Sequence, residues 1–407
     1  MDKNSLDKLS AAFDKVIGNF IKDDESIFPD EKTRAILKYK NSKAILAAWD
    51  KSQNCIYKGC KEKSIPRSHS IQKASSLKLI SEDNHVLAVE FDIHSGKLKT
   101  QKVGINIAST FPGFCKQHED LFSDFESDKE IVNTADFYLQ IYRSVCREIV
   151  LKNYKIGVLE KRKDQYLSFR DTQIAEHLRN ELSDDFMKKH KINLKSLKFT
   201  NLDYRQDKLT SEIKKLKKDV DDFLSKFQTG ITDDIITKKS HKIHITVLVL
   251  DIELPVCLAG RGNFQVARKS KTVNVDAILN VLPYPNRTFI IAAVLSKFKS
   301  ELDMYLSRFS NPLETVNMVE SWMLHGSDHW FIKPSVWDKI KPQFREDILN
   351  EIWDFSKNIG HKCTYSILND VKRLFLDIAA TTDSQNIHPN LQRLLIEEQN
   401  KLTDISS

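Results

Sequence analysis

The chain has 407 residues, which is more than one hydrophobic core comfortably supports, so two or three domains are expected. Hydrophobic residues make up 41% of it and charged residues 29%, with only 11 glycines and 10 prolines, and this composition excludes a fibrous or largely disordered chain. The net charge of +7 is compatible with a polyanionic partner without requiring one.

The N-terminal region, residues 1–49, is expected to be helical because apolar side chains recur at helical spacing over 6–21 and again over 31–49. Acidic residues and lysines are mixed through its start, MDKNSLDKLSAAFDK. A secretory signal would instead have a basic start followed by an apolar block. The longest apolar run of the chain, ITVLVL, has the length of a strand and is too short to span a membrane.

Residues 50–130 are expected to form a compact module. Residues 70–80 have helical spacing, whereas 85–93 and 98–107 alternate like the two strands of a hairpin around the turn HSGK. The turn Phe-Pro-Gly-Phe then precedes a helix that begins near Cys115.

Residues 131–230 are expected to be a helical, coiled-coil region. Helical spacing over 134–155 is followed by a second helical segment through Leu178, and a heptad seam occupies 202–227. The seam requires an apolar partner, and an earlier helix folding back antiparallel costs less entropy than a second chain. A homodimer through the seam is the alternative. The lysines of KKLKK are interpreted as the solvated face of this helix. The seam residues are Leu202, Leu209, Ile213, Leu216, Val220, Phe223 and Phe227.

Residues 231–380 are expected to form a C-terminal α+β domain, and 381–407 a short amphipathic helix with a polar tail. The expected strands are 243–251, 273–282 and 288–295, and the expected helices are 297–308, 313–324 and 342–355. The whole chain is therefore assigned to the α+β class. It would have an N-terminal zinc-stabilised module, a long helical hairpin in the middle, and a C-terminal antiparallel sheet with helices.

Half of the six cysteines fall in two short ligand pairs, Cys55 with Cys60 and Cys115 with His118. Two close pairs of thiolate and imidazole ligands are what a tetrahedral Zn²⁺ site requires, because one tight turn or helix start can hold each pair. Gly59 favours this interpretation, since a knuckle turn needs a permissive backbone. The alternative is that the cysteines are small buried residues and that His118 packs on a helix.

The other three cysteines, Cys146, Cys257 and Cys363, are far apart in apolar surroundings. They are expected to be buried reduced thiols, as in a cytoplasmic protein, and no membrane association is expected.

The run Cys-x4-Cys, then Ser68-His69-Ser70, then Cys-x2-His resembles the zinc-stabilised branch of the HNH (ββα-metal) endonucleases. The segments SHSIQ and ASTFPGFCKQHE also resemble those of uncharacterised bacterial proteins with an HNH-like N-terminal region. The resemblance implies that the zinc pairs hold a hairpin and a helix together and that His69 is the general base on the attacking water. It also implies a second divalent metal, Mg²⁺ or Mn²⁺, on the scissile phosphate, and a role in bacterial host defence.

The chain departs from the HNH pattern at two positions. Ser68 stands where an acid or a second histidine is usual, and Glu119 stands where asparagine is frequent. The candidate ligands of a second metal are Asn84, His85, Glu119 and Asp120. A structural role for His69, within the knuckle or as a zinc ligand, is the alternative to a catalytic one.

Nucleic acid, DNA or RNA, is the expected partner, because basic side chains surround the first ligand pair. These candidate contacts are Lys58, Lys61, Lys63, Arg67 and Lys73. The function expected from the sequence is that of a metal-dependent nuclease. The alternative is a non-catalytic zinc-stabilised protein that binds nucleic acid or serves as a scaffold.

Three further segments are interpreted as structural. AGRGNF, residues 259–264, lacks the pattern of a phosphate-binding loop and is expected to be an ordinary loop. HGSDHWFIKPSVW, residues 325–337, is expected to supply turn caps and core tryptophans rather than a catalytic triad. The charges of Arg143, Arg147 and Glu148 are expected to pair with a neighbouring helix.

Overall fold

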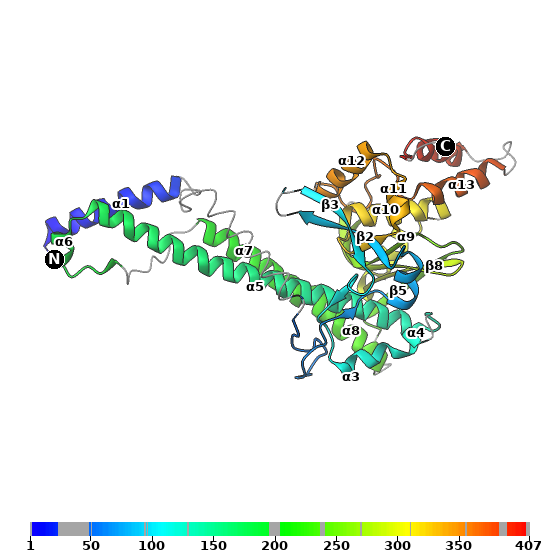
Figure 1. The fold of residues 1–407 in the computed structure, drawn as a ribbon, viewed down its shortest axis with the longest axis horizontal. Helices are drawn as coiled ribbons and strands as arrows, with labels where there is room; N and C mark the ends of the chain where they lie inside the picture. Colours follow the sequence, from blue (N-terminus) through cyan, green and yellow to red (C-terminus); the bar gives the residue numbers. More distant parts are fainter. Residues whose placement is uncertain are drawn as a thin grey trace. The chain divides into compact units, whose positions relative to one another are not determined.

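A computed structural model (Figure 1) describes residues 2–22, 49, 51–92, 95, 97–127, 130–194, 204–236, 241–268, 271–309, 311–354, 356–381 and 389–403. The chain divides into two compact units. Unit 1 comprises Met1–Ala48 and Leu151–Asp221, and unit 2 comprises Trp49–Val150 and Asp222–Ser407. Helices and an antiparallel sheet are both present, in agreement with the predicted α+β class.

Unit 1 is helical. Its described elements are α1 (Lys3–Lys22), the later part of α5 (Thr134–Glu181), α6 (Asp184–Lys189) and α7 (Tyr204–Asp219). The helix expected over 6–21 is confirmed, whereas the one expected over 31–49 lies outside the described residues except for its last position. The apolar stripe of α1 is buried in a small core against α5, α6 and the segment after α6. This core consists of Ala12, Val16, Ile174, Leu178, Leu182, Met187 and Leu194.

α5 is one continuous helix of 48 residues, although the sequence indicated two separate helical segments. Within unit 1, α7 lies beside α5 (Figure 1). Ion pairs join Lys152 to Asp219 at 2.6 Å and Glu160 to Lys217 at 2.7 Å. From the first ion pair to the second, the residue number rises on α5 and falls on α7, so the two helices are antiparallel. The seam requires this arrangement if its partner is an earlier helix.

The heptad seam continues past α7 through a π-helical turn at Val220–Leu224 into α8 (Ser225–Ile236). Ile213, Val220 and Phe227 of the seam are buried. A π-turn inserts one residue into the helical repeat, so it shifts the register of the apolar stripe at this point. Leu202 lies outside the described residues. The coiled coil and the homodimer therefore stay predictions.

Unit 2 is built on a seven-stranded antiparallel sheet of order β3-β2-β9-β6-β7-β8-β5. Every strand expected from the sequence is present, and the hairpin expected over 85–107 is confirmed as β2 paired with β3. The strands are β2 (His85–Asp92), β3 (Lys97–Gly104), β5 (Ile243–Leu250), β6 (Val256–Arg268), β7 (Lys271–Tyr284), β8 (Arg287–Leu295) and β9 (Trp330–Ile332).

The short strand β9 joins the hairpin to the C-terminal strands. Its Ile332 pairs with Leu87 of β2 on one side and with Val256 of β6 on the other. The hairpin was expected to belong to the zinc module alone, but it is the edge of the main sheet. Residues of the ranges 50–130 and 231–380 therefore share one hydrophobic core.

The expectation of a loop at residues 259–264 is wrong, because this segment lies inside β6. Its glycines are explained by close packing. A Cβ atom added to Gly260 would collide with the side chain of Ser327, and one added to Gly262 would collide with Trp322 and Ile359. Glycine within a strand often marks such a close approach.

A stability prediction follows from this packing. Gly262→Ala is expected to destabilise unit 2 by about 1–3 kcal/mol, because the ring of Trp322 must move to admit the new methyl group. Gly157→Ala is the matched control, since nothing lies within 4 Å of the added Cβ and the residue is inside α5. This control is expected to be about 0.5–1 kcal/mol more stable than the wild type. Chemical denaturation measures the free energy of unfolding of both variants. Equal changes in the two variants would show that close packing does not require glycine at position 262.

Helices cover the sheet and complete the core of unit 2 (Figure 1). α10 begins where Asn311 caps the backbone N–H of Glu314 and Pro312 occupies the first turn. Trp330 and Trp337 are buried, as expected for the segment 325–337. The helices are α9 (Lys299–Leu306), α10 (Pro312–His325), α11 (Pro334–Asp338), α12 (Pro342–Trp353), α13 (Asn369–Thr381) and α14 (Pro389–Gln399).

A buried ion-pair group fixes the C-terminal helix. Lys372 of α13, with no exposed surface, lies 2.6 Å from Glu320 of α10 and 2.7 Å from Glu398 of α14. Removal of one member of such a group leaves uncompensated buried charge, which costs far more than the intact group contributes. Of the helices that the structure describes, none is both long enough and apolar enough to cross a membrane.

Candidate metal centre

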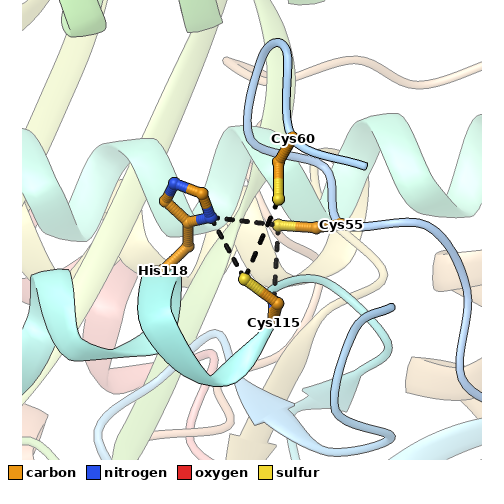
Figure 2. Close-up of side chains that lie close together, drawn as sticks. All are labelled: Cys55, Cys60, Cys115 and His118. Carbon is orange, nitrogen blue, oxygen red and sulfur yellow. Dashed lines mark hydrogen bonds between the residues drawn. The ribbon is translucent and has the colours of Figure 1, made fainter. Parts of the chain in front are cut away.

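The first ligand pair is held by a knuckle turn. The backbone N–H of Cys55 donates to the carbonyl of Glu62 at 2.9 Å, and that of Cys60 donates to the carbonyl of Tyr57 at 3.0 Å. Gly59 has a φ of +83°, in the left-handed region that glycine adopts at least cost. The expected permissive turn at Gly59 is confirmed. The turn brings both sulfur atoms to the same side of the backbone (Figure 2).

The second pair is held by the start of α3 (Lys116–Glu119). Cys115 is the residue before the helix, with an extended backbone, and the N–H of His118 donates to its carbonyl at 3.0 Å. Residues three apart lie on one side of a helical turn, so the sulfur of Cys115 and the imidazole of His118 converge. Figure 2 shows the four side chains directed toward a common centre.

The four ligand atoms have the spacing of a tetrahedral metal site. Cys60 Sγ lies 3.9 Å from Cys115 Sγ, and His118 Nδ1 lies 3.5 Å from Cys55 Sγ and 3.1 Å from Cys115 Sγ. Four ligands around Zn²⁺, with Zn–S bonds of about 2.3 Å, are separated by about 3.8 Å along each tetrahedral edge. All four atoms lie within 4.8 Å of one another, and the group could hold a metal ion such as Zn²⁺.

Neighbouring groups orient these ligands. The N–H of Cys115 donates to Cys55 Sγ at 3.3 Å. The ring of Tyr57 stacks on that of His118, with centroids 3.9 Å apart, which directs Nδ1 toward the sulfur atoms. Burial raises the pKa of Cys55 to about 11. Burial also opposes ionisation of Cys115, yet hydrogen bonds from the backbone of His118 and from other groups bring its pKa below the usual value. A bound cation would compensate the cost of the buried thiolates.

His69 lies on a separate two-stranded sheet next to this centre. β1 (Ser68–His69) pairs antiparallel with β4 (Thr110–Phe111). Its Nδ1 lies 3.3 Å from the hydroxyl of Ser109. Burial, followed by the charges of Arg143 and Lys73, lowers the pKa of His69 to about 4, so the imidazole is neutral at pH 7.

Glu119 is the acidic residue that the structure places beside this sheet. Its pKa is raised by burial, although Arg143 and a hydrogen bond with Ser68 act in the opposite direction. Arg143 Nη2 donates to Glu119 at 3.0 Å and also lies 2.6 Å from Glu126 of α4 (Ser123–Ser127). The expectation that Arg143 pairs with a neighbouring helix is confirmed. Its guanidinium is completely buried over the ring of Phe122.

Two groups in this cluster lack hydrogen-bond partners among the described residues. They are Oε2 of Glu119 and the Nε and Nη1 atoms of Arg143. Buried polar atoms in folded proteins are rarely left unpaired, and such atoms frequently mark the position of a water, an ion or a ligand. One carboxylate oxygen of Glu119 therefore has no hydrogen-bond partner among the described residues.

The other expected ligands of a second metal are not gathered around His69. Asn84 accepts a hydrogen bond from Lys78 at 2.7 Å, and His85 Nδ1 donates to the carbonyl of Asp83 at 2.7 Å, so both are held by the turn before β2. Asp120 is exposed on the 3₁₀ turn after α3. Within the part of the chain that the structure describes, Cys55, Cys60, Cys115 and His118 form the one group of three or more metal-ligating His, Cys, Asp or Glu side chains.

The five basic residues expected to contact nucleic acid are all exposed on unit 2. Lys63 donates to Asn54 at 2.8 Å within the knuckle, and Lys73 donates to Asn106 at 3.4 Å. These residues are Lys58, Lys61, Lys63, Arg67 and Lys73. Their contact with a polyanion stays a prediction.

A buried polar chain that the sequence did not indicate connects β1 to the main sheet. The hydroxyl of Ser70 lies 2.7 Å from His329 Nε2, next to β9, and burial lowers the pKa of His329 well below its usual value. Gln140 of α5 donates both to the carbonyl of Ser70 at 2.9 Å and to Asn280 of β7 at 3.0 Å. These contacts link residues up to 259 positions apart. They hold the strand of His69 in a fixed position relative to α5.

Searches of protein-family models, of curated proteins and of solved structures found no match to this chain.

Proposed function

We propose that this protein is a zinc-stabilised, metal-dependent nuclease that hydrolyses phosphodiester bonds with His69 as its general base. One observation carries the proposal. β1, which bears His69, pairs antiparallel with β4, and α3 follows at once with a ligand of the metal centre. This is the strand–strand–helix order of the HNH endonucleases that the sequence resembles, interrupted by the inserted residues 70–109.

The metal centre has a structural role in this proposal. Its four protein ligands complete a tetrahedron and leave no open position for water or substrate, as in structural zinc sites. The Zn²⁺ would hold the knuckle against the start of α3. Since α3 also bears Glu119, the same ion would fix the position of this carboxylate.

The catalytic roles fall on His69 and Glu119. A neutral imidazole can accept a proton from an attacking water. A second divalent cation, Mg²⁺ or Mn²⁺, would be held through Glu119 Oε2, because these ions prefer carboxylate oxygens. When bound, that ion supplies charge stabilisation at the phosphate.

The test is metal analysis of the purified protein followed by cleavage assays on DNA and RNA with Mg²⁺ or Mn²⁺. We expect one zinc per chain and cleavage that depends on the added ion. One zinc per chain without cleavage of either nucleic acid would eliminate the nuclease and leave the zinc-stabilised module.

The pH dependence of cleavage gives a further prediction. Because the pKa of His69 is lowered to about 4, its neutral form predominates at all higher pH values. The rate is therefore expected to change less than about twofold between pH 7.5 and pH 5.5. A histidine with an ordinary pKa of about 6.5 would instead lose about tenfold over this interval. A tenfold loss at saturating metal would show that His69 has an ordinary pKa in the working enzyme.

The second candidate function is that of a non-catalytic zinc-stabilised protein that binds nucleic acid or serves as a scaffold. Two contacts favour it. His69 contacts the hydroxyl of Ser109, and Glu119 accepts a hydrogen bond from Arg143, so His69 and Glu119 each have a structural partner. In that case the His69→Ala protein would bind nucleic acid as the wild type does, and neither would cleave it.

A further inference from the structure

The net positive charge of the chain is confined to unit 1. Residues 1–48 and 151–221 contain 27 Lys and Arg against 20 Asp and Glu, which gives this unit the entire +7 of the protein. Unit 2 contains 36 of each and is neutral. The candidate catalytic side chains and the metal centre therefore lie on a unit with no net charge, and the excess of positive charge lies on a different one.

Part of this charge forms an exposed group on α7. Lys214, Lys215 and Lys218 are exposed and have no ion-pair partner among the described residues, whereas Lys217 is paired with Glu160 of α5. Residues three and four apart lie near one another on a helix surface, so Lys218 is a neighbour of both Lys215 and Lys214. The opposite face of α7 carries the buried Ile213. We call Lys214, Lys215 and Lys218 the α7 lysines.

A second basic group borders a surface hollow at the end of α5. Arg179, Lys188 and Lys191 line an open cavity of about 650 Å³, together with one acidic residue, Asp184. Apolar side chains also line the cavity, among them Leu194 of the unit 1 core. We call Arg179, Lys188 and Lys191 the hollow cations.

The apolar surfaces of unit 1 point to the class of the partner. A basic helical unit can bind an anionic membrane when an apolar helix face is free to insert into it. On α1, Ala12 and Val16 are not free to insert, because they pack against Ile174 and Leu178. On α7, the exposed side chains from residue 211 to 218 are polar or charged. Basic side chains on a helix surface that is otherwise polar suit a phosphate backbone in water.

We infer that unit 1 binds the phosphate backbone of nucleic acid through the α7 lysines and the hollow cations. The inference rests on the proposed function for the choice of nucleic acid as the polyanion. Unit 1 would supply sequence-independent affinity, since lysine and arginine contacts to phosphate carry no base information.

The experiment compares three triple variants in the His69→Ala background without added Mg²⁺ or Mn²⁺, so that binding is measured without cleavage. The first replaces the α7 lysines with glutamine, and the second replaces the hollow cations with glutamine. The matched control replaces three exposed lysines of unit 2 that have no ion-pair partner in the described chain, Lys102, Lys271 and Lys299. Fluorescence anisotropy with duplex DNA, single-stranded DNA and RNA measures affinity from 50 to 200 mM salt.

Each unit 1 variant is expected to weaken binding about tenfold or more and to reduce the slope of log affinity against log salt by about 2 to 3. The control is expected to change affinity less than twofold. Equal losses in all three variants would overturn the inference, as would unchanged affinity in both unit 1 variants. Binding to phosphatidylserine vesicles with none to DNA or RNA would also overturn it.

Failure of this inference is distinguishable from failure of the proposed nuclease. A wild type that cleaves nucleic acid, combined with unit 1 variants that bind normally, would refute the inference alone. Binding that is lost in the unit 1 variants, combined with a wild type that never cleaves, would refute the nuclease alone.

Discussion

Replacing Cys115 with serine is expected to abolish metal binding and to unfold the region around the knuckle. Cys115 Sγ lies within 3.9 Å of the ligand atoms of both Cys60 and His118, so its loss opens the tetrahedron. Binding of structural Zn²⁺ to small metal-dependent domains contributes about 10–16 kcal/mol of apparent free energy. Even a third of this, about 4 kcal/mol, would lower the melting temperature by about 10 °C in a protein of this size. Elemental analysis and a thermal melt measure the two effects.

The control keeps a competent ligand in place. His118→Cys creates a four-cysteine set that zinc accepts equally well, so this variant is expected to retain one metal per chain, whereas His118→Ala is expected to lose it. If Cys115→Ser and His118→Ala both keep stoichiometric zinc and the wild-type melting temperature, these four residues do not form a metal centre.

Replacing His69 with alanine is expected to lower the cleavage rate by about 10²–10⁴-fold, the usual contribution of a general base. Zinc content and melting temperature are expected to change little, because His69 is only partly buried and its side chain contacts Ser109, not a candidate ligand of the metal centre. Single-turnover cleavage at saturating Mg²⁺ measures the effect. His85→Ala is the control, since this histidine is exposed at the start of β2 and its Nδ1 donates to the carbonyl of Asp83 in its own turn.

Glu119→Gln distinguishes a metal ligand from a structural partner of Arg143. Glutamine keeps a hydrogen-bond acceptor for Arg143 but removes the negative charge that attracts a divalent cation. The half-saturating Mg²⁺ concentration is therefore expected to rise about tenfold or more, with an unchanged melting temperature. If the variant has the Mg²⁺ dependence of the wild type, Glu119 is not a ligand of the divalent cation. His69 would then act without a contribution from Glu119.

The convergence of the four candidate ligands could be predicted from the sequence because each half of the group is local. Cys55 and Cys60 share one turn, and Cys115 and His118 share the start of one helix, so the spacing alone indicates which side chains converge. The hairpin of β2 and β3 is local in the same way. Its alternating pattern and a short turn were sufficient to predict it.

Other features could not be predicted because they depend on residues far apart in the chain. The contact of Ser70 with His329 spans 259 positions, and nothing near either residue indicates the other. The glycines of β6 resemble loop residues until Ser327 and Trp322 are seen to occupy the space of their missing side chains. The continuity of α5 was hidden by Gly157 and by the polar run EKRKDQ at residues 160–165, which has no apolar residue to mark a buried face.

β9 has a consequence for how the protein is synthesised. All four side chains of the candidate metal centre have been made once residue 118 has left the ribosome, so the knuckle and α3 can come together early. β2 has no neighbour except β3 until Trp330–Ile332 emerge, more than two hundred residues later. Pairings of such long sequence separation form slowly. The nascent chain would therefore pass through a state in which the knuckle and α3 are ordered while one edge of the β2–β3 hairpin remains open to other chains.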